Sequence, residues 1–176
     1  MKRGKTTRLY GNHGELIERL RGRHWERSPT GSPRWVFLPN LRVETGFGPN
    51  MDHKPQTLDA WAMDTWPSGG YQMIAYEVKV SRSDYFRELE HPNKRKAALA
   101  LSTHFYFVTP PALVSAQEVP AECGLLYVFD RQIRQVKPAP RRPLPTPTWD
   151  FIVSVVRNLY KEAANPTPSD NEEGAL

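Results

Sequence analysis

The sequence contains a single cysteine, Cys123, among its 176 residues. One cysteine cannot form an internal disulfide and cannot by itself build a zinc site, so a disulfide scaffold and a cysteine-rich zinc module are excluded. The five histidines are scattered along the chain and do not have the spacing of a zinc-protease motif. A reducing, cytoplasmic environment is therefore the expected compartment.

Long apolar runs are also missing. No stretch approaches the roughly 18 apolar residues that a membrane-spanning helix needs. The N-terminus is basic, but no apolar segment follows it, so it does not read as a secretory signal. The chain also lacks an internal repeat.

Charge, by contrast, is plentiful and unevenly distributed. The net charge is +5, residues 1–27 hold eight Lys or Arg against three acids, and the last fifteen residues hold four acids and no base. A basic body suits a polyanionic partner, because Lys and Arg gain free energy by displacing counterions from phosphates. Ordinary solubility explains the same surplus, so charge alone leaves both interpretations open.

Length and hydrophobic content fit one folded domain. Periodicity and turn residues predict a regular succession of elements. These are a helix over 11–25, strands over 34–46, 57–66 and 73–80, helical segments over 83–90 and 93–101, strands over 104–109, 124–130 and 132–137, and a helix over 148–163. This order predicts an α/β sandwich in which helices flank a central mixed sheet.

The C-terminal part divides further. Residues 1–137 are expected to form the core, and residues 138–147, with five prolines, an extended linker. Residues 148–163 are expected to pack on the core as an amphipathic helix, and the acidic residues 164–176 to be disordered. The predicted apolar side of that helix comprises Phe151, Val155, Val156 and Leu159.

The stretch "MIAYEVKV", residues 73–80, has the strongest strand pattern and carries two charges near its end. Because side chains alternate across a strand, one face is apolar and requires a helix against it; that face comprises Ile74, Tyr76, Val78 and Val80. Glu77 and Lys79 share the other face, with their Cα atoms about 6–7 Å apart. The pattern places a carboxylate beside an ammonium at the rim of a sheet, where open α/β sheets bind ligands. A simple ion pair at a partly exposed edge is the alternative.

Asp59 lies eighteen residues before Glu77, one hairpin away. The hairpin can bring the two carboxylates together, and two carboxylates held close repel one another unless a cation joins them. Ligation by oxygen alone favours Mg²⁺ or Mn²⁺, with water completing the shell.

These segments carry a family resemblance. The pattern "LDAWAM…YEVKVSRSDYFRELEHPNKR…FYFVTP…GLLYV", running from about Leu41 to Val128, resembles the PD-(D/E)xK nuclease superfamily and, more narrowly, its MmcB-like group of bacterial and phage DNA-repair nucleases. The resemblance implies a restriction-endonuclease-like sandwich and metal-dependent hydrolysis of phosphodiester bonds in DNA, leaving 5′-phosphate and 3′-hydroxyl ends. Two alternatives stay open: a non-cleaving nucleic-acid-binding protein on the same fold, and a nuclease that acts on RNA.

The resemblance also implies roles for individual residues. Asp59 matches the first acid of the superfamily motif, although Leu58 stands where its proline is expected. Asp59, Glu77 and the Val78 carbonyl would bind Mg²⁺ or Mn²⁺. Lys79 would orient the attacking water or stabilise the transition state.

The superfamily often adds an acid from the first helix. Glu15 in "HGELIERL" fits that position best, with Glu18 as the alternative. The resemblance implies that this acid contributes to catalysis and reaches the metal, directly or through water.

Basic residues after the strand are the candidate DNA contacts. Arg82 is expected to contact a phosphate, with a salt bridge to Glu88 or Asp84 as the alternative. Ser81, together with Asp84, fits a capping box for the helix that follows, and Ser83 is the alternative N-cap. Cations at the start of a helix oppose its dipole, so three of them are expected to contact the DNA backbone, with a solvated face as the alternative; these are Lys94, Arg95 and Lys96.

Overall fold

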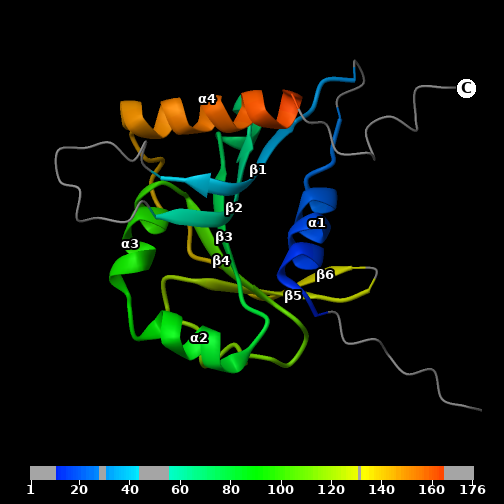
Figure 1. Ribbon diagram of the computed structural model, residues 1–176, viewed down its shortest axis with the longest axis vertical. Coiled ribbons are helices and arrows are strands. Elements are labelled where there is room, and N and C mark those ends of the chain that lie inside the picture. The colour runs from blue at the N-terminus through cyan, green and yellow to red at the C-terminus, as the bar shows by residue number, and fades with distance from the viewer. Residues whose placement is uncertain (1–10, 28–30, 44–55, 131, 165–176) are drawn as a thin grey trace, which may run out of the picture.

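The computed structural model describes residues 11–27, 31–43, 56–130 and 132–164, without the side chains of Asn93 and Lys94. Six strands form one sheet, and helices cover both of its faces (Figure 1). The strands are β1 (Trp35–Arg42), β2 (Thr57–Asp64), β3 (Met73–Val78), β4 (His104–Thr109), β5 (Gly124–Val128) and β6 (Ile133–Lys137). The helices are α1 (His13–Arg23), α2 (Arg82–Leu89), α3 (Asn93–Ala100) and α4 (Trp149–Ala164), with a short 3-10 turn at Pro67–Gly69.

The strands lie side by side in chain order, from β1 to β6. Strands β1, β2 and β3 are antiparallel, β3, β4 and β5 are parallel, and β6 returns antiparallel to β5. Helices α2 and α3 make the crossover between the parallel strands β3 and β4. The prediction of a mixed sheet flanked by helices is confirmed.

Helix α1 covers one face of the sheet. Its first turn is capped by Asn12, whose side-chain oxygen accepts a hydrogen bond from the Glu15 backbone N–H at 2.9 Å. Its buried side chains form one apolar core with the sheet, which includes Leu16, Ile17, Leu20, Ile74, Tyr76 and Val78. The predicted apolar face of β3 therefore has the helix that it requires.

The other face of the sheet packs against α2, α3 and α4. Met73 and Ala75 of β3 face this second core, as the alternation along the strand predicts. Phe151 of α4 meets Trp61 of β2 edge to face, with ring centroids 5.5 Å apart. Helix α4 is thus held across β1 and β2 by aromatic packing.

The predicted apolar side of α4 is partly wrong. Phe151 and Ser154 are buried, but Val156 is 58% exposed and Leu159 is 40% exposed. Phe151 and Val155 pack on the core between the helix and the sheet, and the Ser154 hydroxyl donates a hydrogen bond to the Arg42 carbonyl of β1. The side of α4 that faces the sheet therefore includes Ser154 and not Val156.

Residues 138–147 contain neither helix nor strand, but they are attached to the core. The Arg142 backbone N–H donates to the Thr103 carbonyl at 2.8 Å. The Arg142 guanidinium donates to the carbonyl oxygens of Leu99, Ser102 and Glu122. The segment therefore lies against the domain and does not act as a free spacer.

Two expectations concern the chain as a whole. Most of the predicted acidic tail, residues 165–176, lies outside the described residues. In the part of the chain that the structure describes, no helix has the length and apolar character needed to cross a membrane.

Candidate active site

The site begins where the β2–β3 hairpin ends. Ala60 pairs with Tyr76 and Trp61 with Ala75 in an antiparallel register. The next position of that register brings Asp59 to Glu77, and the Asp59 Oδ2 accepts a hydrogen bond from the Val78 backbone N–H at 2.7 Å. The hairpin predicted to bring the two carboxylates together is present.

Lys79 follows the last residue of β3 and lies between two carboxylates. Its Nζ is 2.6 Å from the Glu77 Oε1 and 3.5 Å from the Glu88 Oε2 of α2. The three side chains are between 10% and 18% exposed. Such shielding strengthens the interaction between the charges relative to an ion pair in open water.

Asp59 is held by a second element as well. The His13 Nε2, at the first residue of α1, is 3.2 Å from the Asp59 Oδ1. With the Val78 N–H on its other oxygen, the Asp59 carboxylate is fixed from both sides. Helix α1, which packs on one face of the sheet, thus reaches a group that also involves α2 on the opposite face.

This group opens to solvent through a pocket with a volume of about 400 Å³. Its lining combines acidic, basic and apolar side chains from α1, β2, the end of β3 and α2. The lining residues are His13, Asp59, Val78, Lys79, Val80, Asp84, Arg87 and Glu88. A polar ligand can therefore approach Asp59 and Lys79 from outside.

The electrostatics of the site reflect the close approach of like charges. Burial, followed by the negative charge of Asp59, raises the pKa of Glu77 to about 7, and the nearby Lys79 offsets this only in part. Burial alone would lower the pKa of Lys79, but the charges of Glu77, Glu88 and Asp59 outweigh it and raise that pKa. Lys79 is consequently an ammonium at neutral pH. A cation between Asp59 and Glu77 would relieve the repulsion that Glu77 experiences.

The donor set can be tested against a metal ion. Among the described residues, no group of three or more His, Cys, Asp or Glu side chains is arranged to hold one. Mg²⁺ does not require such a group, because it is commonly bound by one or two carboxylates together with waters and substrate phosphates. Asp59 and Glu77 fit that requirement.

The comparisons with known proteins bear on the fold. No protein-family model matches this chain, and no curated protein matches it significantly. Among solved structures, the chain is similar to the SPO1766 protein of unknown function from Silicibacter pomeroyi, with a TM-score of 0.58 and 19% identity over 96% of this chain and 98% of that chain. The two proteins share a fold. The likeness says nothing about activity.

The structure does not bring the predicted first-helix acids into the described group around Asp59. Glu15 is exposed on α1. Glu18 is also exposed and lies 3.5 Å from Arg21 on the same helix. His13, two residues before Glu15, is the α1 side chain that contacts Asp59. The position of the helix start explains why a histidine and not a glutamate contacts Asp59. Asn12 is the N-cap, and the first helical residue, His13, lies at the rim of the sheet.

Arg82, the first predicted phosphate contact, has a partner that neither sequence interpretation named. Its guanidinium lies 2.5 Å from the Glu118 Oε1 and donates to the Leu113 carbonyl at 2.8 Å. The predicted alternatives, Glu88 and Asp84, are not these partners. Arg82 therefore ties the start of α2 to the loop that follows β4, and its side chain remains half exposed.

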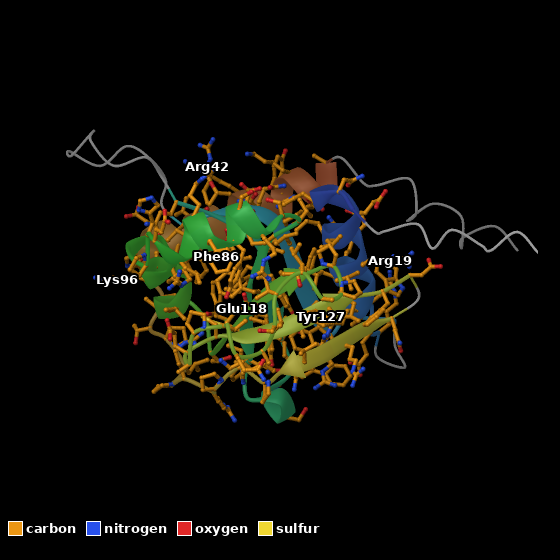
Figure 2. All side chains as sticks on the ribbon, turned by 90° about the horizontal axis from the view of Figure 1, so that it is seen from below. Arg19, Arg42, Phe86, Lys96, Glu118 and Tyr127 are labelled. Carbon is orange, nitrogen blue, oxygen red and sulfur yellow. The ribbon has the colours of Figure 1, made fainter. Side chains whose placement is uncertain are left out.

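The three cations of α3 differ from one another. Arg95 is 6% exposed, and its guanidinium donates to the Glu88 carbonyl at 3.0 Å and lies over the Phe107 ring. Contrary to the expectation of a DNA contact, it faces the interior, where it joins α3 to α2. Lys96 is exposed and points away from the molecule (Figure 2). The side chain of Lys94 lies outside the described residues.

Two residues of the group were not foreseen from the sequence. Glu88 shares the buried face of α2 with Tyr85, three residues earlier, and this spacing was a usable signal. His13 gave no comparable signal, since a single histidine at a helix start has many explanations.

Proposed function

We propose that this protein is a metal-dependent DNA nuclease of the PD-(D/E)xK type, with an MmcB-like motif, that hydrolyses phosphodiester bonds. The observation that carries the proposal is the convergence of Asp59, Glu77 and Lys79 beside an open polar pocket. These are the side chains that the motif requires; Asp59 comes from β2, Glu77 from β3, and Lys79 from the residue that follows β3. The fold alone would not support an activity.

The acidic residues would bind the metal. Asp59 and Glu77 would supply oxygen ligands for Mg²⁺ or Mn²⁺, with the Val78 carbonyl as a further candidate. A bound ion would polarise a phosphate oxygen and lower the pKa of a coordinated water. His13 and the Val78 N–H hold the two Asp59 oxygens, so the orientation of this carboxylate is set before the ion arrives.

Lys79 acts through its charge. Because its pKa is raised, the amine stays protonated at neutral pH and cannot serve as the general base. An ammonium at the pocket wall can donate a hydrogen bond to the attacking water and stabilise negative charge that develops on the phosphate. Glu88, 3.5 Å from the Lys79 Nζ, would hold Lys79 in place if Glu77 bound a metal ion.

The binding of a polyanion is supported by exposed cations. Arg87 lines the pocket, and Lys96 is exposed on α3. Both can meet phosphates of a nucleic-acid backbone. The choice between DNA and RNA rests on the family resemblance.

The second candidate is a nucleic-acid-binding protein that does not cut. It is favoured by the ion pairs that already engage Lys79 and Asp59, and by the absence of a third side-chain ligand among the described residues. The two candidates differ in whether binding is followed by metal-dependent cleavage.

The decisive experiment is cleavage of labelled single-stranded, duplex, branched and mismatched DNA, and of matched RNA, in Mg²⁺, Mn²⁺ or EDTA. Cleavage that requires the metal and falls at least about 100-fold in Lys79→Ala and Glu77→Gln supports the nuclease. Glu90→Gln, an exposed acid just after α2, is the matched control and should retain full activity.

Each other outcome separates the alternatives. Binding without cleavage under all metal conditions favours the non-cleaving protein, and cleavage confined to RNA favours the RNA nuclease. Cleavage by Lys79→Ala and Glu77→Gln at the wild-type rate, with both variants folded, would overturn the assigned site.

A further inference from the structure

Helix α4 carries an apolar stripe on the side that faces away from the sheet. Trp149 is 82% exposed, Val153 37%, Val156 58% and Tyr160 76%. Their spacings of four, three and four residues place all four side chains along one line of an α-helix, the arrangement found at coiled-coil seams. The stripe is distinct from the buried side of the helix, where Phe151 and Ser154 meet the core.

The position of α4 leaves this stripe open. Figure 1 shows α4 along one margin of the molecule, across β1, with no other labelled element on its far side. Single exposed apolar residues are common on protein surfaces, but a contiguous stripe with two aromatic side chains usually marks an interaction site. Nothing in the proposed cleavage reaction uses these residues.

The stripe has the same pattern in both directions along the chain. From either end it reads aromatic, valine, valine, aromatic, with the same spacings. A second α4 running antiparallel to the first would therefore place Trp149 against the partner's Tyr160, and Val153 against the partner's Val156. This self-complementarity is what a twofold symmetric interface requires.

The residues beside the stripe are complementary in the same register. Asp150 and Arg157 lie on one flank, seven residues apart, and both are exposed. In an antiparallel pair, Asp150 would face the partner's Arg157, and Arg157 the partner's Asp150. The other flank carries Ile152 and Leu159, which would face one another across the pair. Apolar and charged contacts thus favour the same orientation.

We propose that α4 is a homodimer interface in which two copies of this chain pair antiparallel along the stripe of Trp149, Val153, Val156 and Tyr160. The occupant is a second copy because the stripe matches itself in shape and charge. Two aromatic and two valine side chains bury on the order of 500 Å² per copy, below the roughly 800 Å² of a standard interface. The dimer is therefore weak and depends on protein concentration. It is independent of the proposed cleavage.

The test is sedimentation velocity of the full chain over a wide concentration range. The wild type should pass from monomer to dimer. The double variant Val153→Ser/Val156→Ser should raise the dissociation constant at least about 10-fold. Val156 is mostly exposed and Val153 is partly exposed in the monomer, so urea unfolding of the double variant checks that it is folded. Leu144→Ser, which changes another exposed leucine outside α4, is the control and should dimerise as the wild type does.

A charge exchange tests the orientation. Asp150→Arg alone places arginine opposite the partner's Arg157, and Arg157→Asp alone places aspartate opposite the partner's Asp150, so each variant should remain monomeric. An equal mixture of the two should dimerise, because every charged pair is then complementary. This recovery cannot come from a folding defect.

Two outcomes would overturn the proposal. One is a wild type that stays monomeric at all concentrations; if hydroxyl-radical labelling then finds Trp149 and Tyr160 protected, a segment of the same chain covers the stripe. The other is a dimer that forms equally well in the Val153→Ser/Val156→Ser variant, which would place the interface elsewhere.

Discussion

Acidification should destabilise this protein through His24, the residue that follows α1. Its ring is 7% exposed and lies among Trp35, Phe37 and Tyr76. Its Nε2 is 2.8 Å from the Tyr76 hydroxyl on β3. Burial, together with the charge of Arg23, lowers the pKa of His24 from 6.5 to about 4.

The direction and size of the effect follow from this pKa. In the unfolded chain His24 takes up a proton as the pH falls through 6.5, whereas in the folded protein it does so only near pH 4. The unfolded state therefore binds more protons between these values, and stability falls as the pH drops from about 6.5 to 4. At about 1.4 kcal/mol for each pH unit, the loss attributable to His24 is about 3 kcal/mol.

Glu77 acts in the opposite direction over an overlapping range. Its pKa is raised to about 7 in the folded protein, from 4.5, so the folded state binds more protons as the pH falls from 7 to 4.5. Stability from this group increases over that interval. In the pH dependence of wild-type stability the two contributions partly cancel. The contribution of His24 is obtained only by comparing the wild type with a variant that lacks this histidine.

The assay is urea unfolding of wild type and His24→Gln without divalent metal, at half-unit steps from pH 7.5 to 4. Glutamine keeps a hydrogen-bonding group for Tyr76 but does not titrate. The wild type should lose about 3 kcal/mol relative to the variant between pH 6.5 and 4. Parallel profiles for the two proteins, with equal m-values, would refute the assignment of a depressed pKa to His24.

Three further predictions concern the site and its supports. Glu88→Gln should lower the rate of DNA cleavage about 10- to 100-fold with little change in DNA affinity, because Lys79 loses its second carboxylate; an unchanged single-turnover rate would contradict this role. Arg95→Ala should lower the free energy of unfolding by about 2–3 kcal/mol, because Arg95 is buried and hydrogen-bonded. Lys96→Ala should leave stability unchanged and weaken DNA binding in a salt-dependent way. A stability loss in Lys96→Ala and none in Arg95→Ala would contradict these structural roles. Arg142→Ala should expose residues 138–147 to limited proteolysis, and an unaltered digestion pattern would show that the backbone bond to Thr103 suffices.

Features set by local spacing could be predicted from the sequence. The alternation of side chains along β3 predicted which residues lie on each of its two faces. Ser81 is the N-cap of α2, and its hydroxyl accepts a hydrogen bond from the Asp84 N–H at 3.2 Å. The hairpin between β2 and β3 joined Asp59 to Glu77, since a short antiparallel connection leaves few registers. In each case the deciding interaction lies close in sequence.

Features that depend on packing between residues far apart in the sequence could not be predicted from it. Arg95 reads as a surface cation, and its burial depends on the Glu88 carbonyl and the Phe107 ring on β4. The orientation of α4 depends on residues far earlier in the sequence, through the packing of Phe151 on Trp61 and the hydrogen bond from Ser154 to Arg42. Amphipathic periodicity is tolerant of such rotation, because α4 has apolar side chains on both sides.

The short connection between β3 and α2 explains how Glu77 and Lys79 can be shielded from solvent at the end of the strand. The N-cap Ser81 lies three residues after the strand ends, and the helix starts at Arg82. The inward face of the helix, with Tyr85 and Glu88, therefore lies over the rim of the sheet. Tyr85 is fully buried and anchors this face, and Glu88 then meets Lys79. If the proposed metal ion bound Glu77, a shielded lysine with a single carboxylate partner would be left unpaired, at a considerable cost in free energy. The Glu88 carboxylate, 3.5 Å from the Lys79 Nζ, would then keep Lys79 paired.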